Sequence, residues 1–184
     1  MAKNAQDKLT RPSPGDLDIY HIISLLPIMP YHEIADICCG VGTLSVPLGK
    51  AVYRGKVTAF DSVKANLTVA RRELKNIRLS NVQAKHMANE KKLPLKDESL
   101  DGVMASFFKQ ASKTPSDILG EAHRVMRSGA WLALMVPENP RFLRFSVAPR
   151  RHLRVSPKLR GGLPHCWSLE RDLILNLQEG RTCF

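Results

Sequence analysis

Residues 34–44 are the stretch that most constrains how this chain can fold. A short apolar run there contains the acid Asp36 and leads into a turn with glycines at Gly40 and Gly42. The pattern is typical of a buried strand that passes through a tight loop into a helix. Because glycine has no side chain, such a loop lets the backbone come close to a nucleotide-like ligand. The stretch therefore predicts a ligand-binding turn.

Strands and helices are predicted to alternate on both sides of this turn. The clearest helical pattern follows Ser62, a predicted N-cap, with apolar residues at spacings of 4, 3, 4 and 3 from Val63 to Ile77. A second cap, Asp16, is predicted for the first helix. Alternation of this kind predicts a parallel sheet covered on both faces, a Rossmann-like, doubly wound α/β fold. The predicted strands are 33–38, 56–61, 82–86, 99–107 and 130–136, and the predicted helices are 17–26, 43–52, 63–77, 114–127 and 169–179.

The length of 184 residues suits one domain with a real core. Residues 1–15 are polar, with two prolines and a glycine, and we expect a flexible lead-in there. Residues 16–137 carry the alternating pattern and are predicted to form the ligand-binding core. Residues 138–184 change character and are predicted to be a basic segment with a final helix in the same domain.

The net charge of +11 is concentrated toward the end of the chain. Nine Lys or Arg residues against three acids in 139–184 contribute +6, and seven of the nine lie between Arg141 and Arg160. A basic surface suits nucleic acid, acidic lipid or an anionic substrate, although a high isoelectric point alone often reflects solubility.

The four cysteines, Cys38, Cys39, Cys166 and Cys183, form neither a disulfide framework nor a C-x-x-C pair for zinc. The N-terminus is too polar for a signal peptide, and no run is long enough to span a membrane. These features predict a cytoplasmic protein without a metal site.

Three ligands compete for the glycine turn. A dinucleotide fingerprint needs a third glycine where Ser45 stands, and a phosphate-cradling Walker loop needs a G-K-[ST] sequence that the chain lacks. S-adenosylmethionine carries no phosphate and needs a carboxylate near its cationic aminoacyl end and another for its ribose. Asp36 and Asp61, at the ends of the first two predicted strands, suit those needs, since a carboxylate only accepts hydrogen bonds.

Four motifs in order give the chain a resemblance to a known family. Residues 17–137 resemble class I S-adenosylmethionine-dependent methyltransferases of the group that includes the ubiquinone and menaquinone biosynthesis enzymes. The motifs are the glycine turn at 36–43, the second-strand acid at 55–61, the Leu-Pro segment Leu93-Pro94-Leu95-Lys96-Asp97-Glu98-Ser99-Leu100-Asp101, and Glu121-Ala122-His123-Arg124-Val125-Met126-Arg127-Ser128-Gly129-Ala130.

The resemblance implies S-adenosylmethionine as cofactor, direct methyl transfer to a small-molecule acceptor, and a set of cofactor-binding residues. Asp36 and the backbone of 38–42 would face the methionyl part, Asp61 and Ser62 the ribose, and Asn89 the adenine. The implied cofactor-binding residues are Asp36, Cys38, Gly40, Gly42, Asp61, Ser62 and Asn89. Methyl transfer needs no fixed base, so no catalytic residue is named; His21, His86, His123, His152 and His165 are the candidates.

The family's sheet normally ends in an antiparallel hairpin after a final helix, and this chain ends right after the predicted helix 169–179. The fold is therefore expected to lack that C-terminal hairpin, leaving the strand 130–136 as an apolar edge. Such an edge invites pairing, so it would be covered by the Arg-rich segment or by a second subunit in a homodimer, or stay open.

Two other functions stay open: a nucleic-acid methyltransferase that uses Arg141 to Arg160, and a truncated non-catalytic domain that binds the cofactor.

Overall fold

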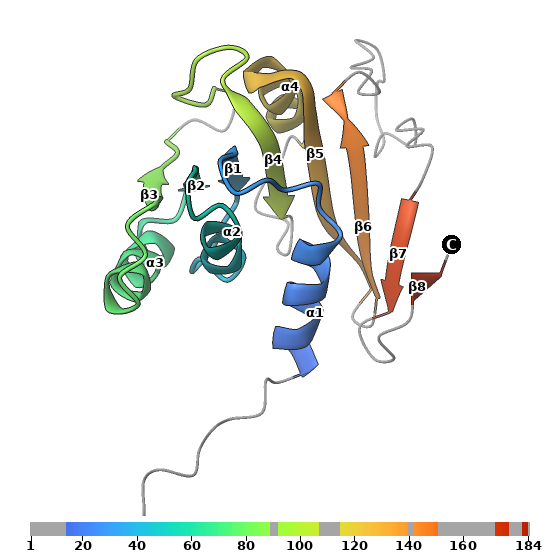
Figure 1. The fold of residues 1–184 in the computed structure, drawn as a ribbon, viewed down its shortest axis with the longest axis horizontal. Coiled ribbons are helices and arrows are strands. Elements are labelled where there is room, and N and C mark those ends of the chain that lie inside the picture. Colours follow the sequence, from blue (N-terminus) through green and yellow to red (C-terminus); the bar gives the residue numbers. More distant parts are fainter. Residues whose placement is uncertain are drawn as a thin grey trace, which may run out of the picture.

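A computed structural model describes residues 14–88, 92–106, 115–139, 142–150, 172–176 and 182–183. One eight-stranded sheet, in the order β3-β2-β1-β4-β5-β6-β7-β8, runs through the molecule (Figure 1). Its strands are β1 Glu33–Ile37, β2 Lys56–Asp61, β3 Val82–His86, β4 Leu100–Ser106, β5 Met126–Asn139, β6 Phe142–Pro149, β7 Asp172–Asn176 and β8 Thr182–Cys183. The helices are α1 Pro14–Ser24, α2 Ser45–Ala51, α3 Lys64–Asn76 and α4 Pro115–Val125.

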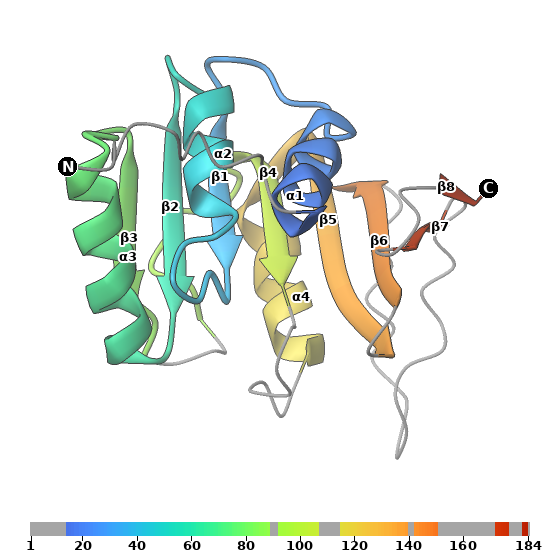
Figure 2. The same cartoon turned by 90° about the horizontal axis from the view of Figure 1, so that it is seen from below.

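The first five strands are all parallel, which confirms the Rossmann-like prediction. Figure 2 shows α1, α2 and α3 on one face of the sheet and α4 on the other. Strand alternation divides the buried side chains between these faces. Ile34 packs in the cluster under α1, α2 and α3, whereas Ile37 packs in the cluster under α4.

Both predicted caps differ from the structure. The first helix begins at Pro14, so Asp16 lies inside its first turn, and Pro14 and Gly15 belong to the helix rather than to the predicted lead-in. Proline is well suited to a first helical position because its fixed φ is already helical. Val63, not Ser62, is the N-cap of α3, and it makes no side-chain capping bond.

The prediction of a final helix at residues 169–179 is wrong. Residues 172–176, inside the predicted final helix, form strand β7, and β6, β7 and β8 continue the sheet as antiparallel strands. The core of β7 is a short continuous apolar run, Leu173-Ile174-Leu175, and periodicity alone cannot tell such a run from a helix.

The predicted open edge of β5 is therefore covered. Strand β6, from the Arg-rich segment, pairs with β5 from Trp131 to Asn139, the first of the three possibilities left by the sequence. This pairing supplies partners to the backbone groups of β5, so the edge on which a homodimer was predicted is occupied.

The junction of α4 and β5 also differs in detail. Helix α4 ends at Val125, before the predicted end at 127, and Gly129 has a φ of +81° within the irregular start of β5. There Leu100 pairs with Met126 but Gly102 with Trp131, so β5 holds extra residues.

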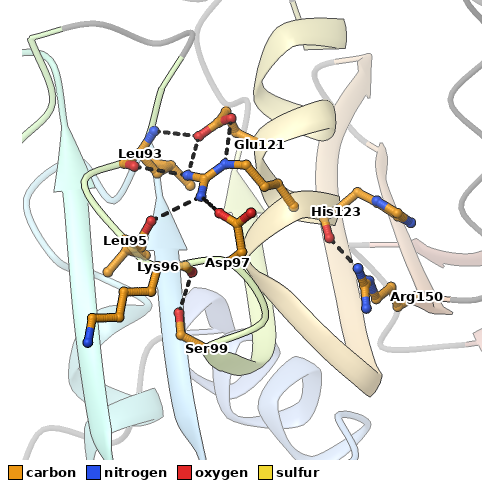
Figure 3. A network of polar contacts seen from close by, with 9 residues as sticks. Leu93, Leu95, Lys96, Asp97, Ser99, Glu121, His123 and Arg150 are labelled. Atoms are coloured by element: carbon orange, nitrogen blue, oxygen red, sulfur yellow. Dashed lines mark hydrogen bonds and ion pairs between the residues drawn. The ribbon is translucent and has the colours of Figure 1, made fainter.

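The guanidinium of Arg124 ties the segment before β4 to α4. It makes five hydrogen bonds, as many as it has N–H donors: two to Glu121, one each to the carbonyls of Leu93 and Leu95, and one to Asp97. Glu121 in turn accepts the Leu93 N–H at 2.8 Å (Figure 3). The Arg124 hydrogen bond holds the pKa of Glu121 below its usual range. Two of the four family motifs are thus joined through one side chain.

Replacing Arg124 with alanine should destabilise the fold by about 2–3 kcal/mol, because Glu121 and the two carbonyls lose their partner. The midpoint of urea unfolding measures this. Arg72→Ala, at an exposed position of α3, is the matched control and should change stability by less than about 0.5 kcal/mol. Equal effects of the two substitutions would contradict the assigned role of Arg124.

Candidate cofactor site

A cleft of about 580 Å³ opens at the carboxyl ends of the parallel strands. Ligands of open α/β sheets bind at this end, outside the strands. Polar lining comes from Asp61 after β2, Asn66 of α3 and Ser106 at the end of β4. Apolar lining comes from Ile19 of α1 and Met135 of β5, among others. The cleft thus has a polar side near β2 and an apolar side toward α1 and β5.

Asp61 joins the glycine turn to the start of α3. Its Oδ2 accepts the Gly40 N–H at 2.8 Å, and its Oδ1 accepts the Val63 N–H at 2.8 Å and the Asn66 amide at 3.2 Å. A carboxylate offers about four acceptor positions, so one position on Oδ2 stays available to a ligand. Asp61 can therefore hold one ligand hydroxyl without giving up its bonds to the protein.

The glycine turn has three residues in the left-handed backbone region: Cys38 at φ +61°, Gly40 at +56° and Gly42 at +91°. This conformation costs a non-glycine residue about 1–2 kcal/mol, a cost that Cys38 bears. A Cβ added to Gly40 would meet nothing within 4 Å, whereas one on Gly42 would lie 3.3 Å from the Ala70 Cβ. Gly40, which lines the cleft, thus has open space where a side chain would stand, and Gly42 permits packing against α3.

Asp36 lies fully buried beneath the turn. Its Oδ2 accepts a hydrogen bond from the Ser45 hydroxyl at 2.5 Å, and its Oδ1 has no partner within the described part of the chain. Burial raises the pKa of Asp36 to about 7, the nearby charge of Asp61 adds to the rise, and the Ser45 bond opposes it. Ser45, which stands where a dinucleotide fingerprint needs its third glycine, therefore donates a hydrogen bond directly to this acid.

The structure brings together most of the predicted site residues. Cys38, Gly40, Asp61 and Ser62 line the cleft. Gly42 lines a neighbouring hollow of about 280 Å³ instead. Asp36 is close by through Ser45 but does not line the cleft, and Asn89 lies outside the described residues.

Several lining residues were not predicted, namely Ile19, Thr43, Leu44, Val63, Asn66, Ser106 and Met135. Val63 and Asn66 follow Asp61 closely, so the start of a helix after the acid was a usable signal. Ser106 and Met135 reach the cleft only through the order of the strands, which local sequence does not give.

Among the described residues, neither Cys39 nor a candidate histidine offers a nucleophile or base at the cleft. Burial raises the pKa of the Cys39 thiol well above its usual range, which keeps the sulfur protonated. Of the candidate bases, His21, His86 and His123 do not line the cleft, and His152 and His165 lie outside the described residues. Within the described ranges there is no cluster of His, Cys, Asp and Glu that could hold a metal ion, and no helix long and apolar enough to cross a membrane.

Comparison with known proteins agrees with this geometry. The family model described as a methyltransferase domain matches residues 35–134, more than half of the chain. The demethylmenaquinone methyltransferase of Alkalihalophilus pseudofirmus is 28% identical over 116 residues, which cover 62% of this chain and 49% of that protein. The corresponding enzyme of Listeria welshimeri is 29% identical over 119 residues, 64% of this chain and 50% of that protein. The chain thus spans about half the length of these curated relatives.

A solved structure is similar over a larger share of its own length. The SAM-dependent methyltransferase from Aquifex aeolicus superimposes with a TM-score of 0.63 at 27% identity, covering 72% of this chain and 73% of that one. Residues 35–134, which the family model matches, include the glycine turn and Asp61, so these parts of the cleft lie in the region that carries the family match.

The raised pKa of Asp36 makes stability depend on pH in a specific direction. The unfolded carboxyl ionises near 3.8 and the folded one near 7, so in between the unfolded chain binds fewer protons. Stability should therefore fall as pH rises from about 4 to about 7. Asp36→Asn removes this contribution, and above pH 7 the variant should exceed the wild type by roughly 4 kcal/mol. Urea unfolding of both proteins at pH 5 and pH 8 measures the difference; a constant difference between the two pH values would contradict it.

Proposed function

Because the chain belongs to the methyltransferase domain family, we propose that it binds S-adenosylmethionine in the cleft and transfers the methyl group to a small-molecule acceptor. The observation that carries the proposal is the juxtaposition of Gly40 and Asp61 at the cleft. The turn leaves space where a side chain would stand, and a carboxylate beside it keeps an acceptor position. A ligand with hydroxyl groups and no phosphate suits this pair.

The residues present fit the parts of the cofactor. Asp61 would accept a hydrogen bond from a ribose hydroxyl, with Ser62 beside it on the cleft wall. The backbone from Cys38 to Gly40 would lie along the methionyl part, since Gly40 has no side chain to obstruct it. Asp36 would place negative charge behind the cationic end. Residues 16–137 would form the cofactor-binding unit, and Asn89 stays a prediction for the adenine.

When bound, the cofactor supplies an electrophilic methyl group on a sulfonium sulfur. The protein would position the acceptor against this methyl group and exclude water from the cleft. Met135, Leu44 and Ile19 line the cleft and give an apolar wall on which an uncharged acceptor can pack. Holding an acceptor in line and within near-attack distance supplies much of the rate enhancement without a base.

A small-molecule acceptor is supported by the relatives' name, demethylmenaquinone methyltransferase, and by this apolar wall. A nucleic-acid acceptor has less support. Arg150, the described side chain in the basic segment, is engaged within the protein: it pairs with Glu98 at 2.7 Å and donates to the carbonyl of His123. The cytoplasmic location stays a prediction.

Binding and transfer can be measured separately. Isothermal titration should show binding of S-adenosylmethionine to the wild type and at least about tenfold weaker binding to Asp61→Asn, in which one carboxylate oxygen becomes an amide nitrogen. Asn has the same shape but keeps one acceptor oxygen, so it also loses the hydrogen bond to Gly40 or the bonds to Val63 and Asn66. Asp101 lies near the start of β4, at the opposite end of the parallel strands from the cleft. Asp101→Asn is therefore the matched control and should bind S-adenosylmethionine like the wild type.

Transfer itself is tested by incubating the protein with cofactor carrying a labelled methyl group and a cell extract. Label appearing in small, solvent-extractable products supports the proposal, whereas label in RNA or DNA favours the nucleic-acid alternative. Cofactor binding with no transfer to any fraction would favour the non-catalytic domain instead.

Gly40, with φ +56°, and Gly129, with φ +81°, are two glycines in the left-handed backbone region, and Gly40 lines the cleft whereas Gly129 does not. Both have positive φ, and a Cβ on either would meet nothing within 4 Å. Alanine at either position should lower stability by about 1 kcal/mol. Only Gly40→Ala should weaken cofactor binding, by tenfold or more, because its methyl group enters the cleft. Equal affinities of the two variants in the same titration would exclude the turn as the binding surface.

A further inference from the structure

A basic groove of about 620 Å³ lies between α3 and β3, the strand at one edge of the sheet. Figure 2 shows α3 beside β3, at the opposite edge from β7 and β8. The groove is lined by four cationic side chains and, among the described residues, by no acid. The cations are Arg71, Lys75, Arg78 and Lys85. None of the residues that line the groove lines the cofactor cleft, so the two are separate surfaces.

The cations of the groove are available to a ligand. All four are exposed. The side chains of Lys75, Arg78 and Lys85 have no ion-pair or hydrogen-bond partner in the part of the chain that the structure describes. Arg71 and Lys75 are four residues apart on α3, a spacing at which like charges destabilise a helix. An anion in the groove would offset this repulsion, so the groove points to an anionic ligand.

Contacts in the groove argue against three kinds of occupant. Arg71 donates from Nε and Nη2 to the Ala84 carbonyl, at 3.0 and 2.9 Å, and so occupies a backbone acceptor that an added strand would need. A bilayer would need apolar side chains that protrude, but those of the groove are buried or half-buried: Leu74, Leu79, Val82 and Ala84. A second copy of the chain would be repelled by its own net charge of +11. A phosphate backbone meets none of these obstacles.

An exposed aromatic ring lies near one end of the groove. Ser80 lines the groove, and the next residue, Asn81, donates its side-chain amide to the carbonyls of Gly49 and Val52, at 2.8 and 2.9 Å. Tyr53 directly follows Val52 and is 68% exposed, more than any other large apolar side chain in the described part of the chain. Cations that follow a backbone and a ring that stacks on a base are the combination that binds single-stranded nucleic acid.

We propose that the groove binds the phosphate backbone of single-stranded nucleic acid, with Tyr53 stacking against a base. A single strand suits the groove better than a duplex, because the volume is that of a small-molecule pocket. Phosphate contacts carry no sequence information, so the binding is independent of sequence. It needs no cofactor, because the groove and the cleft share no lining residue, and it is measured separately from the proposed function.

The dependence of binding on salt tests the phosphate contacts. The probe is a fluorescein-labelled single-stranded RNA of mixed sequence and about 12 nucleotides, and its binding to the full chain is followed by fluorescence anisotropy. Each neutralised phosphate of a single strand adds about −0.7 to the slope of log K against log salt, so the four cations predict a slope of about −3. A wild type that does not bind this RNA at low salt would overturn the proposal.

Removing two cations should reduce that dependence. The double variant Lys75→Ala with Arg78→Ala is expected to make the slope shallower by about 1.4, and Lys75→Ala alone by about 0.7. Arg72→Ala with Lys96→Ala removes the same charge from exposed positions outside the groove and should leave the slope unchanged. Equal reductions by the two double variants would show that binding follows net charge rather than the groove, and the proposal would fail.

Tyr53 gives a reading that does not depend on charge. Tyr53→Ala should weaken RNA binding at least about fivefold and leave the salt slope unchanged, because the ring stacks but is uncharged. Tyr53→Phe, and the control Tyr20→Ala at an exposed position of α1, should bind like the wild type. An unchanged affinity of Tyr53→Ala would contradict the proposal. So would tighter binding of poly-L-glutamate than of the RNA at the same salt, a result that indicates an acidic protein partner instead.

Discussion

The cleft depends on the carboxylate of Asp61. One side chain at the end of β2 accepts N–H groups from Gly40 in the turn and from Val63 at the start of α3. The hydrogen bond to Val63 replaces the side-chain cap that α3 otherwise lacks. The turn and the helix are therefore held at a fixed spacing by the group that we propose to hold the ribose. Ligand recognition and the shape of the site cannot vary independently here.

The other family motifs act at a distance from the cleft. Arg124 and Glu121 lie on α4, on the far face of the sheet, and bind the backbone of the Leu-Pro segment that leads into β4. Since β4 ends at Ser106, the position of its far end depends on where this segment is anchored. The motif residues therefore stabilise the strand that supplies the cleft wall rather than touching a ligand.

The sequence predicted the parallel core well because its signals are local and repeated. The apolar run before the turn, the acid at the end of β2 and the regular face of α3 each specify an element from a few adjacent residues. The C-terminal strands were missed because Leu173-Ile174-Leu175 fits either a strand or a helix, and only pairing with β6 decides between them. Tertiary context overrides a short local pattern in this way.

The site residues likewise divide into those predictable from adjacent sequence and those that depend on tertiary structure. Cys38, Gly40, Asp61 and Ser62 were predicted because they stand in contiguous motifs, and all four line the cleft. Ser106 and Met135 come from β4 and β5 and meet the turn only after the strands have taken the order β1-β4-β5. The ligand assignment from sequence rested on the residue types of Asp36 and Asp61, whereas their depths and partners required the structure.

Burial of Asp36 connects these features to the charge of the ligand. An ionised carboxylate at that depth is costly, and the raised pKa means that a proton can offset its charge near neutral pH. A bound cation can offset the same charge, so the proton and a cationic ligand compete for one site. The neighbouring charge of Asp61 raises the cost further, which strengthens the preference for a cation. A neutral or anionic ligand would gain nothing from this arrangement, and a phosphate would be repelled by it. In the proposed complex the two acids would favour the cationic end of S-adenosylmethionine by electrostatics, independently of the shape of the glycine turn.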